Sequence, residues 1–393
     1  MKRIVLLFCI AGMMCGCSTT RPAAPCAEEK AQAACTASPA QALAAAPLKV
    51  GVYADKGPGG IGAVEWFRLV KESPEMDLTL LDGADVRAGK LAGLDVLVMP
   101  GGSSMAEFDS LGTNGVAKMK EFMRAGGGYV GTCAGCCLLM DGPKKRARVF
   151  PWNSHGSEGD LFFPQFKLTP AGQKALGLGA GPHVIRYHGG PFMWPTKNKI
   201  ADAKVEVWGT FNAEATFKGQ LKKEKRMYGA AAIIGGTYGK GRLFATSAHP
   251  EYFESTLPFV KAAFKYVTGR DVTFPARTRR PHALSVGFLA KGISGKKTAE
   301  TALALAQVKD FDLVLIDKDG IFMRRMDNID VLVVPSAIFV KNKKVSEAIS
   351  AFTARGGKVV YCCAGTKDAP AGAATSTSGD AVVEAVRKLF PTH

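Results

Sequence analysis

One cysteine of this sequence is bracketed by glycines in the segment GTCAG (131–135). An apolar run precedes Cys133 and a helix-like stretch begins at Ala134, which predicts a sharp turn between a strand and a helix. A nucleophile on such a turn needs small neighbours on both sides, because the flanking chains pass closely. The start of a helix also favours the thiolate form, since it carries partial positive charge. The segment therefore predicts a nucleophilic cysteine at Cys133.

A histidine and a carboxylate follow another apolar run, RLFATSA. They stand in the sequence His249-Pro250-Glu251. An imidazole can act as a general base toward a thiol, and a carboxylate can orient that imidazole and stabilise its charged form. The proline between them restricts the backbone. Together with Cys133, the pair predicts a Cys–His–Glu triad.

The cysteines around Cys133 allow other interpretations. Cys133 and Cys136 form a C-x-x-C pattern at a helix start, which can support thiol–disulfide exchange in an exported protein. Cys136 and Cys137 can instead be small buried residues that pack under the sheet. A third possibility is a non-catalytic binding or scaffold protein, because a fold does not fix a function.

The elements around these residues predict an α/β fold. Short runs rich in Val and Leu, such as DVLVMP and YVGT, read as strands buried on both faces. Helix-like stretches at 61–73 and 115–128 lie between them. The alternation predicts a doubly wound, mostly parallel sheet, with ligands beyond the carboxyl ends of its strands. Farther on, we expect a hairpin that turns through Gly235 to Gly241 and a closing helix at 258–269.

The two halves of the chain contain similar sequence segments in the same order. The paired blocks are 48–57 with 284–292, 76–86 with 311–321, 94–102 with 329–337, and 121–135 with 351–365. Such a repeat predicts a second, smaller copy of the same α/β unit.

The second copy has lost the residues that the chemistry needs. Tyr361 stands in place of Gly131, and Pro335-Ser336-Ala337 stands in place of Pro100-Gly101-Gly102. No His-Pro-Glu follows its own Cys-Ala-Gly. We expect this copy to be inactive, and to serve in self-association or as an intramolecular pseudo-dimer.

The beginning of the chain indicates export. Lys2 and Arg3 precede an apolar run too short to span a bilayer, and the following MCGCS resembles a lipoprotein cleavage box with Cys17 as the lipidated residue. The expected organisation is a signal peptide at 1–17, an Ala/Pro-rich tether at 18–47, a first domain at 48–270, a linker at 271–283 and the partial repeat at 284–393. This predicts a protein of the bacterial envelope, lipid-anchored and facing the periplasm from the outer membrane.

The formal net charge of +17 does not indicate a nucleic-acid partner. The chain shows no aromatic-basic nucleic-acid motif, and most of the charge is expected on a solvated surface. His155 and His183 lack metal-ligand spacing, so neither a metal nor a cofactor is expected. Glu107 and Asp109, which follow the Pro-Gly-Gly loop, are also expected on a solvated face.

These motifs resemble the class I glutamine amidotransferase superfamily. The loops near Gly59, Gly101, Cys133 and His188 resemble most the amidotransferase-like N-terminal domain of biotin–protein ligases, which also occurs in stand-alone bacterial proteins. The likeness covers about 48–270 and implies a flavodoxin-like sheet. No Gly-Arg-Gly-rich biotinyl-adenylate loop is present, so biotin ligation is not implied.

The resemblance assigns roles to individual residues. Cys133 is the nucleophile, His249 the base and Glu251 the orienting acid. The oxyanion hole is assigned to Gly101, Gly102 and Ala134. Gly59, His188 and Gly189 are candidates for substrate contacts, although His188 can equally be a structural residue of its loop. The implied function is an amidohydrolase or acyl transferase that acts on a small glutamine-like or γ-glutamyl-like amide through a thioester.

Overall fold

The computed structural model describes residues 46–142, 145–154, 161–212, 227–276, 283–289, 295–316, 325–335, 343–362 and 378–391. Its contacts divide the chain into residues 1–45 and 46–393, and everything described belongs to the second part. The predicted signal peptide, including Cys17, and all but the last two residues of the predicted tether lie outside the described residues. None of the described helices combines the length and the apolar composition that a membrane span requires.

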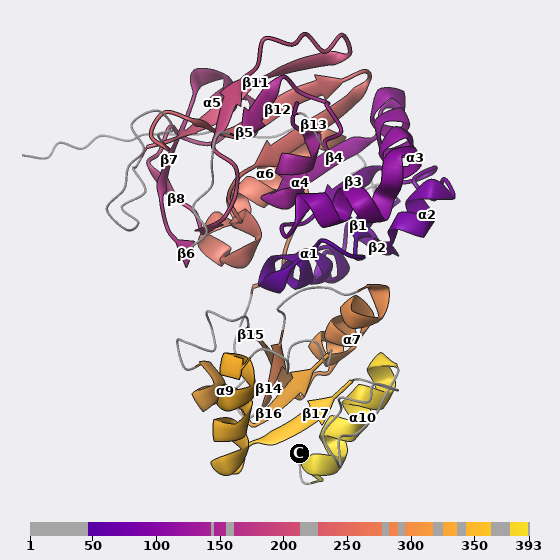
Figure 1. Cartoon of the computed structure of the whole chain (residues 1–393), viewed down its shortest axis with the longest axis vertical. Coiled ribbons are helices and arrows are strands. Elements are labelled where there is room, and N and C mark those ends of the chain that lie inside the picture. The colour runs from indigo at the N-terminus through magenta and orange to yellow at the C-terminus, as the bar shows by residue number, and fades with distance from the viewer. Residues whose placement is uncertain are drawn as a thin grey trace, which may run out of the picture. The chain divides into compact units, whose positions relative to one another are not determined.

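Five parallel strands form one side of the first sheet, in the order β2-β1-β3-β4-β13 with β2 at the edge (Figure 1). Their bounds are Leu48–Tyr53 for β1, Met76–Leu81 for β2, Val96–Met99 for β3, Gly128–Thr132 for β4 and Gly241–Thr246 for β13. The carboxyl ends of β3, β4 and β13 lie side by side, because these strands are adjacent and parallel. This edge brings together segments that are far apart in the sequence.

Beyond β13 the sheet continues with antiparallel strands, in the order β12-β11-β7-β8, while β10 pairs with both β12 and β5. A separate pair is formed by β6 and β9. The bounds are Trp152–Ser154 for β5, Leu161–Phe162 for β6, Gln165–Leu168 for β7, His183–Val184 for β8, Tyr187–His188 for β9, Met193–Pro195 for β10, Ala203–Phe211 for β11 and Ala231–Tyr238 for β12. The predicted α/β class with a mostly parallel core is confirmed, with an antiparallel extension.

The predicted hairpin turn was too wide. The chain turns only at Gly239 and Lys240, and Gly235 lies inside β12. A Cβ atom on Gly235 would lie 2.1 Å from the Trp208 ring. The glycine therefore leaves room for that buried ring on β11, and its presence does not mark the turn.

Helices cover both faces of the first sheet. Alternate residues of β3 separate the two faces, since Val96 and Val98 pack with α1 and α6, whereas Leu97 and Met99 pack with α3 and α4. The helices are α1 (Gly60–Glu72), α2 (Gly83–Arg87), α3 (Ser104–Ala125), α4 (Ala134–Leu139), α5 (Pro170–Leu176) and α6 (Leu257–Thr268). Two 3-10 turns, η2 (Pro250–Tyr252) and η3 (Glu254–Thr256), precede α6.

The helix-like stretch predicted at 115–128 corresponds to the second half of α3, and the first half was not predicted. This helix begins at Ser104, where the side chain of Ser103 caps it by accepting a hydrogen bond from the N–H of Ala106 at 3.4 Å. Gly112 interrupts its regular backbone, with φ 63° and ψ 175°. The first half of α3 is polar and has no continuous apolar stripe. It nevertheless packs against the sheet.

The second sheet has four parallel strands in the order β15-β14-β16-β17. This order matches β2-β1-β3-β4, and the register matches as well, since Val50 pairs with Val96 as Val286 pairs with Val331. The strands are β14 (Leu284–Leu289), β15 (Phe311–Ile316), β16 (Val331–Val334) and β17 (Lys358–Tyr361). The helices are α7 (Lys296–Gln307), η4 (Arg325–Asn328), α9 (Lys343–Ala354) and α10 (Gly379–Leu389). The expected inactivity of this part stays a prediction, because residues 363–377 lie outside the described chain.

Candidate active site

Cys133 occupies the turn between β4 and α4 in an unusual backbone conformation. Its φ of 48° and ψ of −100° are rare for a residue with a side chain and cost about 1–3 kcal/mol. The turn is held by hydrogen bonds from the N–H of Cys133 to the carbonyl oxygen of Thr246 at 2.8 Å and from the N–H of Cys137 to that of Cys133 at 2.9 Å. Surrounding structure thus fixes the thiol on a strained turn.

The glycines that bracket Cys133 are explained by close packing. A Cβ atom on Gly135 would lie 2.1 Å from the carbonyl oxygen of Met99, and one on Gly131 would lie 2.7 Å from the ring of Tyr129. The hydroxyl of Tyr129 donates a 2.8 Å hydrogen bond to the carbonyl oxygen of Gly135. The absence of side chains at both glycines allows the elbow to pack against β3 and β4.

His249 and Glu251 follow β13 and form a buried pair. His249 Nδ1 lies 2.8 Å from Glu251 Oε1, and the two residues are 5% and 0% exposed. Because a carboxylate can only accept, Nδ1 carries the proton and Nε2 is left to act as a base. The N–H of His249 also donates to the carbonyl oxygen of Arg186 at 2.8 Å. The imidazole is therefore fixed in one orientation.

Cys133 and His249 converge on Gly101, at the end of β3. A Cβ atom on Gly101 would lie 2.5 Å from His249 Cε1 and 3.1 Å from Cys133 Cβ. The Cys133 side chain interacts with the imidazole, and its sulfur lies 3.6 Å from the carbonyl oxygen of His188. The structure thus brings the three residues predicted for the triad to one edge of the sheet.

The environment of His249 favours the imidazolium form. Burial lowers the pKa of His249, but the charge of Glu251 and hydrogen bonds with Cys133 and Glu251 outweigh burial and raise it to about 9. The group's contribution to stability is fully present below its unfolded pKa, near 6.5, and is lost as the pH rises through about 9. A protonated imidazole beside the sulfur suits a thiolate–imidazolium pair.

Replacing Glu251 with glutamine should lower the pKa of His249 by more than about one unit, since burial then acts without the opposing charge. The imidazole C–H resonances, followed by NMR across pH 5–10, measure this shift. Glu254→Gln is a suitable control, because Glu254 is an exposed carboxylate on the next turn of the chain. A His249 pKa that stays near 9 in Glu251→Gln would contradict the orienting role of Glu251.

The loop after β3 presents backbone donors beside Cys133. Its shape is fixed by hydrogen bonds from Gly59 N–H to Gly101 O and from Ser103 N–H to Gly57 O, both 2.8 Å long. Gly102 has a φ of 148°, which favours glycine. No hydrogen bond within the described residues uses the N–H of Gly101, Gly102 or Ala134. These N–H groups are therefore unused within the described chain, and their part in an oxyanion hole stays a prediction.

The residues expected to contact substrate have other contacts. The N–H of Gly59 holds the Gly101 loop, and a Cβ atom there would lie 3.3 Å from Gly102 Cα. His188 faces Cys133 with its carbonyl oxygen, and Gly189 follows it with a φ of 72°. All three therefore lie around the elbow, and their contacts with a substrate stay a prediction.

Three residues that support the site were missed from the sequence. Gly62 on α1 leaves room for the His249–Glu251 pair, since a Cβ atom there would lie 2.6 Å from Glu251 Oε1. Trp66 Nε1 donates to Thr132 Oγ1 at 3.2 Å, directly before the nucleophile. Arg186 stacks 3.8 Å over the ring of Tyr252, which contacts His249. The only sequence signal for these residues was the apolar stripe of α1, which indicated a core position rather than a position near the site.

The expectation that Glu107 and Asp109 lie on a solvated face was wrong for Glu107. Asp109 forms an exposed ion pair with Lys145 at 2.5 Å, but Glu107 is 0% exposed. The first turn of α3 carries Glu107 toward the sheet, because this helix begins earlier than the sequence suggests. A carboxyl group therefore lies in the interior close to the elbow.

The two cysteines after Cys133 differ in their surroundings. Cys136 is 0% exposed and its sulfur lies 3.5 Å from that of Met193, in the apolar layer under the sheet. Burial raises the pKa of the Cys136 thiol well above its ordinary value. Cys137 is half-buried, and burial raises its pKa as well. Neither environment favours a reactive thiolate.

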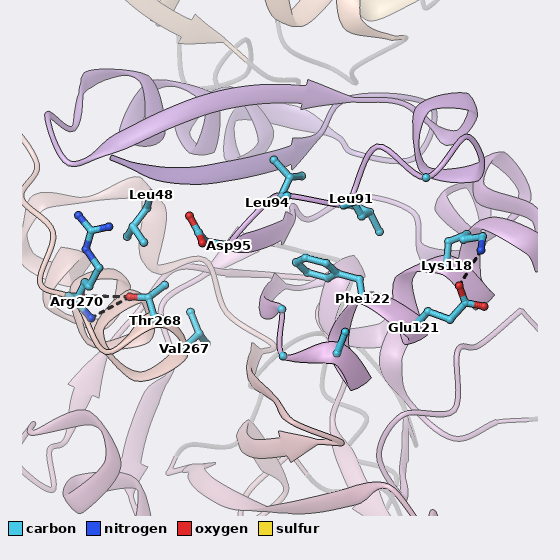
Figure 2. Close-up of a pocket in the computed structure, with 16 residues that line it drawn as sticks. Leu48, Leu91, Leu94, Asp95, Lys118, Glu121, Phe122, Val267, Thr268 and Arg270 are labelled. Carbon is cyan, nitrogen blue, oxygen red and sulfur yellow. Dashed lines mark hydrogen bonds and ion pairs between the residues drawn. The ribbon is translucent and has the colours of Figure 1, made fainter. Parts of the chain in front are cut away.

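The described chain also contains a cavity of about 830 Å³ (Figure 2). It is lined mainly by the amino ends of the parallel strands and the ends of α3 and α6, including Leu48, Asp95, Phe122 and Val267. Cys133 and His249 follow the carboxyl ends of β4 and β13, so the cavity lies at the opposite edge of the sheet.

Within the described ranges, no group of three or more His, Cys, Asp or Glu side chains is placed to bind a metal ion.

Comparison with known families supports the expected resemblance over one segment. Residues 92–138 match the family described as biotin-protein ligase, N terminal. This segment runs from the approach to β3 to α4 and contains the Gly101 loop and Cys133, whereas His249 and Glu251 lie beyond it. No curated protein matches the sequence.

Several solved structures are similar to part of the chain. A ThuA-like protein from Bacteroides uniformis is 14% identical, with 58% of this chain and 94% of that chain covered and a TM-score of 0.43. PurLQS from Thermotoga maritima is 13% identical, with 56% and 99% covered and a TM-score of 0.40. A β-galactosidase from Rahnella sp. R3 is 17% identical, with 56% and 31% covered and a TM-score of 0.37. The fold class itself rests on the strand order described above.

Proposed function

We propose that the protein is a cysteine amidohydrolase or acyl transferase that cleaves a small amide through a thioester on Cys133. The observation that carries this proposal is the buried 2.8 Å contact between His249 and Glu251. It orients the imidazole of His249, which interacts with the Cys133 side chain beside Gly101. Acyl transfer requires a thiol, an oriented base and unused backbone N–H groups close to one another.

The proposed reaction begins with attack of the Cys133 thiolate on the amide carbonyl carbon. The N–H groups of Gly102 and Ala134 stabilise the oxyanion, the C–N bond breaks, and His249 gives its proton to the leaving amine. Water, or another acceptor, then attacks the thioester and gives up a proton to His249. Cleavage of the C–S bond releases the acid or the new acyl product and regenerates the Cys133–His249 pair.

The burial of the site favours a small substrate. Cys133 is 6% exposed and His249 is 5% exposed, so only a slender group can reach the sulfur. The primary amide of glutamine or of a γ-glutamyl compound has this shape and supplies the carbonyl that the mechanism needs. The resemblance to an amidotransferase-like family over residues 92–138 points to the same class of substrate.

The redox alternative receives less support from the geometry. A Cys133–Cys136 disulfide would require Cys136 to leave its contact with Met193 in the apolar layer under the sheet. Thiol–disulfide exchange also has no use for the His249–Glu251 pair, since neither residue takes part in that reaction.

The proposal is tested by trapping the thioester. The full-length protein is incubated with glutamine and with a panel of γ-glutamyl and simple amides, quenched in acid and measured by intact-protein mass spectrometry. We expect an acyl adduct on Cys133, together with ammonia or amine release, and neither in Cys133→Ser. No adduct with any amide, together with thiol labelling that does not depend on His249, would favour a binding protein instead. A reversible Cys133–Cys136 disulfide that is insensitive to Glu251→Ala would favour redox exchange.

We also propose that a lipid on Cys17 anchors the protein in the bacterial envelope, on the basis of its signal sequence. In a bacterial host that processes lipoproteins, the wild type should then fractionate with the outer membrane, and Cys17→Ala should release it from the membrane fraction. Recovery of both forms in the same fraction would contradict the anchor.

A further inference from the structure

Glu107 is a buried acid that the proposed mechanism does not use. It lies in the first turn of α3, where its N–H donates to the carbonyl oxygen of Ser103 at 2.9 Å. The residue is 0% exposed, and neither carboxyl oxygen has a hydrogen-bond partner among the described residues. Such a position is rare for glutamate, because acidic side chains are seldom fully buried unless they are paired.

The burial of Glu107 implies that its carboxyl group is neutral. An ionised carboxylate without hydrogen bonds in the interior costs far more than a protonated one, so the group keeps its proton. Burial raises the pKa of Glu107 well above its usual range, and the negative charge of Cys133 raises it further, while Arg146 opposes this shift.

Glu107 packs behind the loop that carries the proposed oxyanion hole. A Cβ atom on Gly57 would lie 2.5 Å from Glu107 Cγ, and the carbonyl oxygen of Gly57 accepts from Ser103 N–H at the base of that loop. Glu107 forms no hydrogen bond with Cys133. Its effect on the thiol therefore acts through space, across a region from which water is excluded and in which charges are poorly screened.

The groups that face Glu107 come from four directions. They are Tyr53 at the end of β1, Tyr129 on β4, Cys133 and Cys137 at the elbow and on α4, and Arg146 after α4. Burial raises the pKa of both tyrosines and of Cys137, and the charge of Glu107 adds to each shift. Of these neighbours, Cys133 is the one that the proposed mechanism uses as an anion, so its charge is the one that competes with a charge on Glu107.

We propose that Glu107 is a positioning residue for Cys133, and that the two groups hold a single negative charge between them. Glu107 keeps its proton whenever Cys133 is a thiolate, and the neutral carboxyl group does not repel the negative charge on the sulfur. Formation of the thioester removes the charge on sulfur, so ionisation of Glu107 becomes easier in the acyl-enzyme. The inference rests on the proposed function, because it takes Cys133 to be the reactive thiolate.

Two infrared titrations of the full-length protein test this coupling. Infrared spectroscopy follows the C=O band of the protonated Glu107 acid, which is assigned by its loss in Glu107→Gln. We expect the pH at which this band disappears to fall by about one unit in Cys133→Ser. Carboxamidomethylation of Cys133 by iodoacetamide, which removes the charge on sulfur as a thioester would, should lower that pH by a similar amount.

Glu121→Gln is the matched control, since Glu121 is an exposed acid on the same helix. It should change neither titration. A Glu107 that is ionised at pH 7, or a band midpoint that Cys133→Ser does not move, would overturn the proposal. If Glu107→Gln does not fold, the comparison of wild type with Cys133→Ser decides alone. Neither titration uses amide turnover, so a protein that shows the coupling but cleaves no amide would contradict only the proposed function.

Discussion

Replacing Cys133 with serine is expected to lower kcat/KM for amide cleavage by about 10⁴-fold or more. The serine hydroxyl is a much weaker nucleophile at neutral pH, because it is not ionised, whereas the elbow and the oxyanion donors stay in place. His249→Ala should cause a loss of about 10³-fold or more, since the mechanism then lacks the imidazole that takes up and returns the proton. Both variants are compared with wild type in steady-state assays on whichever amide gives the thioester.

Thiol labelling provides a measurement that does not require the substrate. Iodoacetamide should modify Cys133 of the wild type rapidly at pH 7, and His249→Ala should slow this modification by about tenfold or more, because the imidazolium no longer stabilises the thiolate. Cys362→Ser is the control, since Cys362 follows β17 in the second sheet and should leave labelling and activity unchanged. Equal labelling rates with and without His249 would remove the histidine from the proposed triad.

The convergence of the three residues of the proposed triad could be predicted from the sequence because its signals are local. Cys133 stands between its two glycines, and His249 and Glu251 are separated by one proline. The order of predicted strands and helices then places both motifs at the carboxyl ends of parallel strands. Neighbouring strands β4 and β13 bring the two motifs together, although more than a hundred residues separate them.

The environment of Glu107 could not be predicted because it depends on a distant segment. Residues 103–110 read SSMAEFDS, a polar run without a continuous apolar stripe, so the helix start was missed. The burial of Glu107 comes from Gly57, which lies after β1 and packs on its Cγ. Nothing in either segment alone indicates that contact. The sequence also gives no sign that the carbonyl oxygen of His188 lies 3.6 Å from the Cys133 sulfur.

The second copy shows what the shared topology alone does not supply. Its strands have the same order and register as β1 to β4, yet Tyr361 occupies the position that corresponds to Gly131. In the first copy, a Cβ atom at that position would already lie 2.9 Å from the carbonyl carbon of Gly135. A tyrosine side chain is therefore incompatible with the same elbow, and the chemistry depends on small residues that the fold does not require.

The same reasoning predicts that Gly101→Ala lowers kcat/KM by about 10²-fold or more. The added Cβ atom would lie 2.5 Å from His249 Cε1 and 3.1 Å from Cys133 Cβ, so the imidazole must move away from the sulfur. A displacement of about 1 Å between reacting groups is enough for such a loss. Gly179→Ala is the matched control, because a Cβ atom on Gly179 meets nothing within 4 Å and should leave activity unchanged.

Thermal unfolding and thiol labelling separate a local effect from a global one. We expect Gly101→Ala to keep a cooperative unfolding transition and yet to label slowly at Cys133, because the thiolate has lost its partner rather than its position on the elbow. A variant as active as the wild type would mean that His249 does not need to occupy the space beside Gly101. The proposed mechanism would then lose its base.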